Sequence, residues 1–383
     1  MNFNLNSEQQ LLQDSVRRFV DKDYGFEART ALIKARSTCD DRHWHTFAEN
    51  GWLAAALPEA YGGLDGSLID TVLIAQQLGR GLVLEPYLGC AVLAAQTFLA
   101  AATPAQCERV LPQVADGSQK LALAFSEDGA RGLPEHVKLH AQREGDGYRL
   151  SGSKTLVLGG AHAHRFIVSA VSPAFDGIGL FLVDADSAGL ARRALRLHDG
   201  TGAAELSFDG VFVPGEAMLG EPGNGLAALR QGIAHATAAL CAELVGAMEQ
   251  AIETSAEYLK VRKQFGVLIG SFQALQHRLA DMAAELEIAR SMLYVLLASI
   301  ENDDAALRQY TVSQAKSLIG RAARYVCGQA IQLHGGIGMT EEYSVGHFYK
   351  RAAVADLLLG SSDRHEAACA THLQQTLLQR EPA

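Results

Sequence analysis

The sequence predicts an α+β protein in which a helical part, a strand-rich part and a second helical part follow one another. Residues 1–118 and 219–383 carry apolar side chains at helical spacing. Residues 119–218 instead form short runs of Val, Leu, Ile and Phe, separated by Gly, Asp, Pro and Ser. Helices and strands that are segregated along the chain are typical of the α+β class. We therefore expect an N-terminal α-helical domain, a middle β domain and a C-terminal helical bundle with these boundaries.

The N-terminal part begins with a pattern typical of a helix start. Ser7 is a candidate N-cap, and Gln10 follows three residues later, which is the spacing of a capping box. Five apolar residues then share one helical face, namely Leu11, Leu12, Val16, Phe19 and Val20. A further helix is predicted over residues 72–84.

The middle part consists of five segments with strand character. They are LALAFSEDG, GYRLSGSKTLVL, RFIVSAV, IGLFLVD and AELSFDGVFVP. Short strands at this spacing, with turn residues between them, predict a small antiparallel sandwich or barrel.

The C-terminal part shows the strongest helical periodicity. Apolar residues alternate at intervals of four and three at Leu275, Leu279, Met282, Leu286, Ala289, Leu293, Leu296 and Ile300. This seven-residue rhythm is expected of a bundle helix that packs against other helices. Another helix is predicted over residues 311–333.

Composition narrows the classes of function. The chain of 383 residues has a net charge of −10, which disfavours binding to nucleic-acid phosphates. No apolar run approaches the roughly 18–20 residues of a membrane helix, and the start, MNFNLNSEQQ, lacks a signal-peptide pattern. Six scattered cysteines without a C-x-x-C motif are expected to be reduced thiols, many of them in the core. We therefore expect a cytoplasmic protein that binds neither nucleic acid nor membrane.

Two motifs in the C-terminal part suggest a phosphate site. Arg262 lies in RKQFG at the end of a predicted helix, and Gly335-Gly336 lie in QLHGGIGMTEEY. Paired glycines let the backbone approach a phosphate closely, and arginine can bind that phosphate with two hydrogen bonds. Each signal has a plainer explanation, since a basic residue offsets the helix dipole and glycine often ends a helix. Together, in this order, they are specific.

These motifs carry a resemblance to a known family. EYLKVRKQFGVLIGSFQALQHRLADM and QLHGGIGMTEEY, preceded by LALAFSEDG, DGYRLSGSK and FLVD, resemble the acyl-CoA dehydrogenases over essentially the whole chain. Within the family, the chain is most similar to the small subunit of pimeloyl-CoA-type and steroid-side-chain-type dehydrogenases, which often work as heteromers.

The resemblance implies a fold, a cofactor and a set of binding residues. The fold is an N-terminal helical domain, a middle β domain and a C-terminal four-helix bundle. The cofactor is FAD, held between the middle domain and the bundle, with its ADP half bound by a neighbouring subunit. No metal is implied. The residues that match the family's FAD-binding positions are Ser126, Arg262, Phe265, Gln273, Gln332, Gly335, Gly336, Ser362 and Arg364.

The family reaction requires a carboxylate that this chain lacks at the expected place. The base removes the α proton of an acyl-CoA thioester while flavin accepts the β hydride, so it must lie within proton-transfer reach of the α carbon. The usual glutamate position falls on Gly360, in LLLGSSDRHE. The alternative position used by some members falls near Ala236-Thr237 and is not acidic either.

Two further departures concern the flavin. The usual Thr-Glu-Pro-x-x-Gly-Ser-Asp loop is degenerate here as Ser126-Glu127-Asp128-Gly129-Ala130-Arg131. The usual Trp-Ile-Thr or Trp-Ile-Ser stretch is Leu156-Val157-Leu158, which offers no hydroxyl to flavin N5.

Other acidic and histidine residues are weaker candidates. Asp363 is a weak candidate for a relocated base, and with Glu366 it also fits a solvated helix start capped by Ser361 or Ser362. His162 and His164 could flank a metal, but no third ligand is evident, so a surface loop is favoured. For His334 we expect a structural or cofactor-adjacent role.

The chain matches the family's FAD-binding positions but lacks its catalytic glutamate. Three hypotheses follow from this difference. The first is an enzyme subunit that desaturates an acyl-CoA only with a second acyl-CoA dehydrogenase-like chain, which supplies the glutamate. The second is a self-sufficient homotetramer with a relocated base. The third is a non-catalytic flavin- or CoA-binding scaffold. For both enzymes the resemblance implies electron-transfer flavoprotein as the acceptor and a role in fatty acid or steroid side-chain catabolism.

Overall fold

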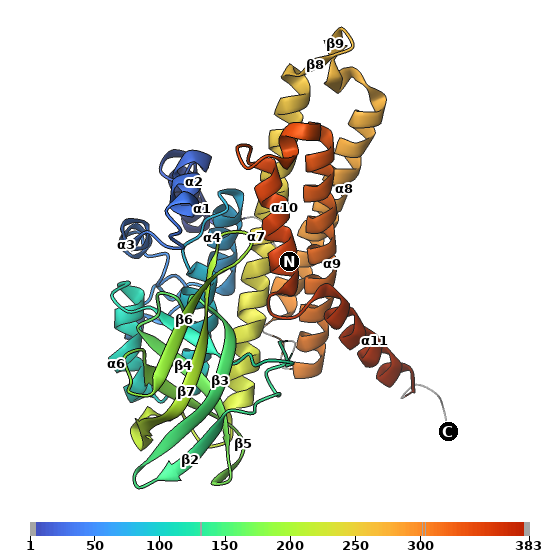
Figure 1. Ribbon diagram of the computed structural model, residues 1–383. Coiled ribbons are helices and arrows are strands. Elements are labelled where there is room, and N and C mark those ends of the chain that lie inside the picture. Colours follow the sequence, from blue (N-terminus) through green and yellow to red (C-terminus); the bar gives the residue numbers. More distant parts are fainter. Residues whose placement is uncertain (1–4, 131, 301, 303, 379–383) are drawn as a thin grey trace. The chain divides into compact units, whose positions relative to one another are not determined.

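The computed structural model describes residues 5–130, 132–300, 302 and 304–378. The chain forms two compact units. The first unit comprises Met1–Arg29, Val72–Val83 and Thr237–Ala383, and it contains most of the long helices. The second comprises Thr30–Thr71 and Leu84–Ala236, and it contains the sheet. Figure 1 shows the elements of both units.

The N-terminal part is helical, as predicted. Its helices are α1 (Ser7–Lys22), α2 (Phe26–Lys34), α3 (Asp41–Glu49), α4 (Leu68–Arg80), α5 (Ala95–Ala101) and α6 (Pro104–Ala115), with a π-helical stretch over Tyr87–Ala94 before α5. The predicted cap of α1 is wrong by one residue. Asn6 accepts the amide of Gln9 at 2.8 Å, and the Gln9 side chain accepts the amide of Asn6, so the capping box begins at Asn6 and Ser7 is the first helical residue.

The middle part forms one sheet of seven strands among the described residues. The strands are β1 (Leu121–Ala124), β2 (His140–Glu144), β3 (Gly147–Leu158), β4 (Arg165–Ser172), β5 (Phe175–Asp184), β6 (Leu190–Arg196) and β7 (Gly202–Pro214). Their order is β1-β4-β2-β3-β7-β6, and β5 pairs with β4. Most pairs are antiparallel, as predicted, but β1 runs parallel to β4, which the alternating pattern alone does not indicate.

Strand β3 is interrupted by a bulge near its end. Lys154 pairs with Leu206 and Val157 pairs with Ala204, so Thr155 and Leu156 together face one residue of β7. Leu156 adopts a positive φ of 51°, which is uncommon for a residue with a side chain. The bulge therefore separates the regular part of β3 from Val157 and Leu158.

The C-terminal part forms the predicted helical bundle. Its helices are α7 (Gly225–Val261), α8 (Gln273–Ser299), α9 (Ala305–His334), α10 (Val345–Leu357) and α11 (Ser362–Leu378), and α9 packs against α8, α10 and α11. A short hairpin of β8 (Lys263–Gln264) and β9 (Val267–Leu268) connects α7 to α8. The heptad rhythm of α8 is confirmed, because its buried residues are Met282, Leu286, Ala289, Leu293 and Leu296.

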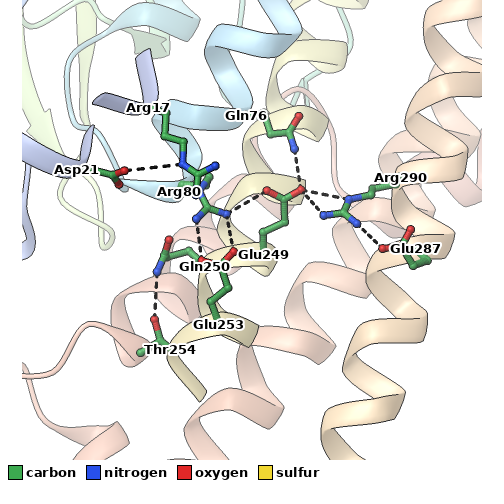
Figure 2. A network of polar contacts seen from close by, with 10 residues as sticks. All are labelled: Arg17, Asp21, Gln76, Arg80, Glu249, Gln250, Glu253, Thr254, Glu287 and Arg290. Carbon is green, nitrogen blue, oxygen red and sulfur yellow. Dashed lines mark hydrogen bonds and ion pairs between the residues drawn. The ribbon is translucent and has the colours of Figure 1, made fainter. Parts of the chain in front are cut away.

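A network of buried and half-buried charges joins α4, α7 and α8 (Figure 2). Its centre is Glu249 on α7, which is 8% exposed. The Glu249 carboxylate accepts hydrogen bonds from Gln76 Nε2 at 2.7 Å, Arg290 Nη2 at 2.7 Å and Arg80 Nη1 at 3.3 Å. Arg80 also binds Glu253 through both terminal nitrogens, at 3.2 and 2.8 Å. Because both Glu249 oxygens are engaged, this carboxylate is structural.

Two further sequence expectations concern the cysteines and membrane-spanning helices. Cys39, Cys90, Cys107, Cys241 and Cys327 are free and buried, as expected of thiols in a core, and Cys369 is half-buried. Within the described ranges, none of the helices combines the length and apolar character that crossing a membrane requires.

Candidate active site

The turn that carries the expected glutamate position connects α10 to α11. Leu359 and Gly360 both have positive φ, at 57° and 101°. The turn ends where the Ser361 hydroxyl accepts the amide of Arg364 at 3.3 Å, so Ser361, one of the two predicted candidates, caps α11. Gly360 itself is buried. Two consecutive residues in this conformation make a sharp reversal that glycine favours at the second position.

The space beside Gly360 is already filled by side chains. A Cβ at this position would lie 2.5 Å from Arg364 Nη1 and 2.8 Å from His365 Nε2. His365 is fixed, because Nε2 donates to the Leu359 carbonyl at 3.0 Å and Nδ1 lies 3.0 Å from the Ser313 hydroxyl. Burial lowers the pKa of His365 to about 4, so the ring is neutral at pH 7. The turn therefore has no carboxylate at Gly360, and a side chain there would have to displace both Arg364 and His365.

A buried lysine holds the same turn from the side of α9. Lys316 is fully buried, and its Nζ donates to the carbonyls of Asp356 at 3.0 Å and Gly360 at 2.9 Å. These carbonyls lie at the end of α10 and just beyond it, where helix carbonyls lack partners of their own. Burial lowers the pKa of Lys316. The lysine thus fixes the backbone of the turn that carries the expected base position.

Two of the three carboxylates near Gly360 form hydrogen bonds or ion pairs with other side chains. Asp356 accepts from the hydroxyl of Ser362 and lies 3.6 Å from Arg324. Glu366 forms an ion pair with Arg321. Asp363 is exposed in the first turn of α11, where a negative charge is favourable.

The alternative base position on α7 is also apolar or uncharged. Ala236 and Thr237 are both fully buried. The next acidic residue along the helix, Glu243, is 9% exposed and binds Arg351 with two hydrogen bonds of 2.6 and 2.8 Å. Both oxygens of this carboxylate are therefore bound to a buried arginine, which is a structural arrangement.

Several predicted FAD-binding residues meet at one end of the first unit. Tyr258, in the last part of α7, stacks on His334 of α9 with ring centroids 4.4 Å apart. Arg262 follows Tyr258 by about one helical turn, and Gly335 follows His334 directly. The hairpin that carries Phe265 begins at the same end of α7, and Phe265 is 90% exposed.

The glycine pair at this end leaves open backbone. Gly335 has a φ of 62°, and no heavy atom lies within 4 Å of a Cβ placed on Gly335 or Gly336. His334 Nδ1 donates to the Ala330 carbonyl at 2.7 Å, whereas buried Nε2 has no hydrogen-bond partner among the described residues. An open glycine turn beside an unpaired acceptor can receive a ligand's polar groups.

The remaining predicted residues lie elsewhere. Lys316 and His334 are eighteen residues apart on α9, roughly 27 Å along its axis, so the turn with Ser362 and Arg364 is remote from the glycine pair. The Ser362 hydroxyl is already bound to Asp356. Ser126 lies in the second unit, half-buried, and Arg131 lies outside the described residues.

The histidines outside these groups have local partners. His162 Nε2 lies 2.7 Å from the Thr38 hydroxyl, and His164 Nδ1 accepts the Lys120 amide at 2.9 Å. His43 Nδ1 lies 2.9 Å from Oε1 of Glu85, whose side chain is fully buried. Sequence reasoning missed this pair, because the two residues are separated by 42 positions and neither has a periodic signal.

Comparisons with known proteins agree with the order of the three parts along the chain. Residues 6–118, 122–211 and 223–374 match the N-terminal, middle and C-terminal domain models of acyl-CoA dehydrogenase. The chain belongs to the acyl-CoA dehydrogenase family. A relative from Bacillus subtilis (strain 168), named probable acyl-CoA dehydrogenase YngJ, is 29% identical over 97% of this chain and 100% of its own length.

Two other similar proteins work in complexes, according to their names. The ChsE4-ChsE5 complex from Mycobacterium tuberculosis contains a chain with a TM-score of 0.89 and 26% identity, with complete coverage of both chains. The caffeyl-CoA reductase-Etf complex subunit CarC from Acetobacterium woodii is 29% identical over 82% of this chain and 85% of its own.

Membership confirms the predicted fold and cofactor. Acyl-CoA dehydrogenases are flavoprotein oxidoreductases that act on acyl-CoA, and FAD is their cofactor. The residues at the end of α7 and α9 fit a dinucleotide, because the glycine turn is open and exposed Arg262 has no carboxylate partner within the described part of the chain. The individual FAD contacts and the catalytic base remain predictions.

Proposed function

We propose that this chain is the subunit of a heteromeric acyl-CoA dehydrogenase that lacks the catalytic base. A second acyl-CoA dehydrogenase-like chain supplies the glutamate and most of the substrate-binding surface. The reaction is α,β-desaturation of an acyl-CoA with a bulky or dicarboxylic acyl group, and electron-transfer flavoprotein is the acceptor. The supporting relatives are ChsE4-ChsE5, named as a complex, and CarC, named as part of an Etf complex.

The closed turn at Gly360 is the observation that carries this proposal. A simple loss of the base would leave a glycine beside free space, but here Arg364 and His365 fill the space and Lys316 holds the backbone. These contacts support a structural role for the expected base position. By contrast, Arg262, Phe265, Gln273, Gln332, Gly335 and Gly336 are all exposed, as residues that bind a neighbour's cofactor must be.

Two groups of predicted FAD-binding residues lie far apart along α9, which supports a cofactor shared between two chains. The group around Gly335 and the group around Arg364 are too far apart to act on the same phosphates. We assign the first group to a FAD seated mainly in the partner. When bound, FAD accepts the β hydride, while this chain's residues hold its pyrophosphate and ribose and keep its ADP half in place.

The test compares the chain alone with the chain co-expressed with a partner. The partner to be tested is an acyl-CoA dehydrogenase-like chain with an intact glutamate, sought among the neighbouring reading frames. Reduction of electron-transfer flavoprotein is followed with straight-chain, dicarboxylic and bulky acyl-CoAs. We expect turnover by the complex only, and its loss when the partner's glutamate is changed to glutamine. Robust oxidation by this chain alone would refute the division of labour.

A self-sufficient enzyme with a relocated base is the second candidate. Asp363 favours it, because this exposed carboxylate near the turn has no ion-pair partner among the residues described. Asp363→Asn and Glu366→Gln would separately test it in the chain alone. Activity that survives both substitutions excludes these residues as the base. A yellow protein that no acyl-CoA bleaches, with or without a partner, would instead indicate a flavin-binding scaffold.

A further inference from the structure

A fully buried lysine lies next to the bulge of β3. Lys154 has a side chain with no exposed surface, and its Nζ donates to Glu127 Oε1 at 2.7 Å and to the Ser169 hydroxyl at 2.8 Å. Ser169 is a buried residue of β4. Lys154 therefore reaches from β3 both to a neighbouring part of the sheet and to the loop after β1, which contains Glu127.

Glu127 uses both of its oxygens to fix that loop. Oε1 accepts from Lys154 and from the amide of Leu139 at 3.1 Å, and Oε2 accepts the amide of Lys138 at 2.8 Å. Three donors from two segments satisfy a carboxylate that is only 7% exposed. Without the lysine, the same carboxylate would be a buried charge opposed only by backbone amides, which is strongly unfavourable.

The loop and the bulge are joined by a second, adjacent bond. The Thr155 amide belongs to the bulge and lacks a partner in β7, and it donates instead to the Ser126 carbonyl at 2.9 Å. Thus Ser126 binds Thr155 while Glu127 binds Lys154. Two neighbouring residues of the loop are paired with two neighbouring residues of β3.

These two segments are the ones expected to contact the flavin. Ser126 matches the family position that hydrogen-bonds the ring, and Leu156-Val157-Leu158 replace the stretch that packs on it. The Ser126 hydroxyl makes no hydrogen bond to any residue that the structure describes, so it is available to a ligand. Beyond it, Asp128 and Gly129 are exposed, and the space around a Gly129 Cβ is empty.

We infer that Lys154 and Glu127 form a clamp that sets the position of Ser126 relative to the bulge of β3, and so places both flavin-contacting segments together. Lys154 is a positioning residue in this arrangement, since it reaches the cofactor only through Glu127 and Ser126. The inference rests on the family's use of FAD and concerns a flavin ring seated on this chain's own middle part, apart from the FAD that the proposed function seats mainly in the partner.

The test uses Lys154→Met, with Ser169→Ala as a matched control. The control removes the other partner of the same lysine but leaves the bond to Glu127. Hydrogen–deuterium exchange of a peptide over residues 153–158 reports the Thr155 amide in the chain alone. The FAD dissociation constant is measured by flavin fluorescence, on the chain or on its complex with the partner.

We expect Lys154→Met to accelerate the exchange of Thr155 by about tenfold or more, because the pair that closes the loop is lost. Peptides from β4 and β7 keep their exchange rates, FAD binding weakens by about tenfold or more, and Ser169→Ala changes neither property to that extent. If Lys154→Met does not fold, the neutral double variant Lys154→Met/Glu127→Gln replaces it with the same expectations.

Three results would overturn the inference. Unchanged exchange at Thr155 would mean that the pair does not hold the loop. Equal acceleration across the whole sheet would mean that the pair only stabilises the unit. Faster exchange at Thr155 with unchanged FAD affinity would mean that the position of the loop is irrelevant to the flavin. Because the exchange readout needs neither partner nor turnover, these outcomes are separate from failure of the proposed function.

Discussion

Placing an alanine at Gly360 tests whether the base position is closed. The substitution forces a side chain onto a φ of 101°, which costs about 1–3 kcal/mol. The new Cβ would also lie 2.8 Å from His365 Nε2, so the ring must move and give up a hydrogen bond worth about 1 kcal/mol. Arg364 is longer and can move aside. We therefore expect a loss of about 2–4 kcal/mol in the free energy of unfolding.

The assay is denaturant unfolding of Gly360→Ala beside a control that separates strain from crowding. Gly335→Ala has a φ of 62° and a ψ of −136° but open space around the new Cβ, so it carries only the conformational cost of about 1–3 kcal/mol. For a unit of this size, Gly360→Ala should lower Tm by about 5–15 °C. Equal losses for the two variants would refute the idea that His365 and Arg364 fill the slot.

The same geometry predicts that a glutamate at Gly360 cannot restore a base. Gly360→Glu adds the same Cβ and a longer chain to a turn that Lys316 and His365 already hold. We expect the variant chain alone to be destabilised and without acyl-CoA oxidation. Activity in a folded Gly360→Glu homomer would show that the turn is open after all.

The remaining predictions concern the charge network, the pH dependence and the cofactor. Glu249→Gln should cost about 1–3 kcal/mol in urea unfolding because it weakens the charge-assisted hydrogen bonds from Arg80 and Arg290, which keep Glu253 and Glu287 as partners, whereas exposed Glu253→Gln should cost less than about 1 kcal/mol. His365 has a folded pKa of about 4, below its ordinary value of 6.5, so its contribution to stability is present above pH 6.5 and is lost as the pH falls toward 4. That contribution is about 3 kcal/mol, and unfolding at pH 7 and pH 4.5 should show a smaller difference in His365→Gln than in the parent chain. Arg262→Ala should weaken FAD binding by the complex by about 10- to 100-fold in flavin fluorescence titrations, whereas neighbouring Lys263→Ala should not.

Periodic features of the sequence predicted the fold well, because each is repeated over many residues. The intervals of four and three in α8 correspond to its buried face, from Met282 to Leu296. Asp363 and Glu366 are exposed in the first turns of α11, as a solvated helix start requires. Such patterns depend only on local geometry, so one sequence suffices to find them.

Buried polar groups were not predictable in the same way. Lys316 lies within a predicted helix, where a lysine is normally solvated, yet it is fully buried because the carbonyls that it binds come from a turn forty or more residues later. Lys154 and Glu127 likewise pair across 27 positions. Each residue alone has no periodic signal, and only the tertiary fold brings its partner within reach.

The turn at Gly360 differs from one that has merely lost a carboxylate, because neighbouring side chains occupy the space beside the glycine. The resemblance alone implies only that the expected base position, Gly360, is not acidic, and such a loss could be reversed by one substitution. In the structure the glycine conformation, His365 and the lysine-bound carbonyl depend on one another. Restoring a carboxylate therefore requires changes at several residues together, since any single change leaves the others strained or unpaired. A turn of this kind suits a chain that relies on another polypeptide for proton abstraction.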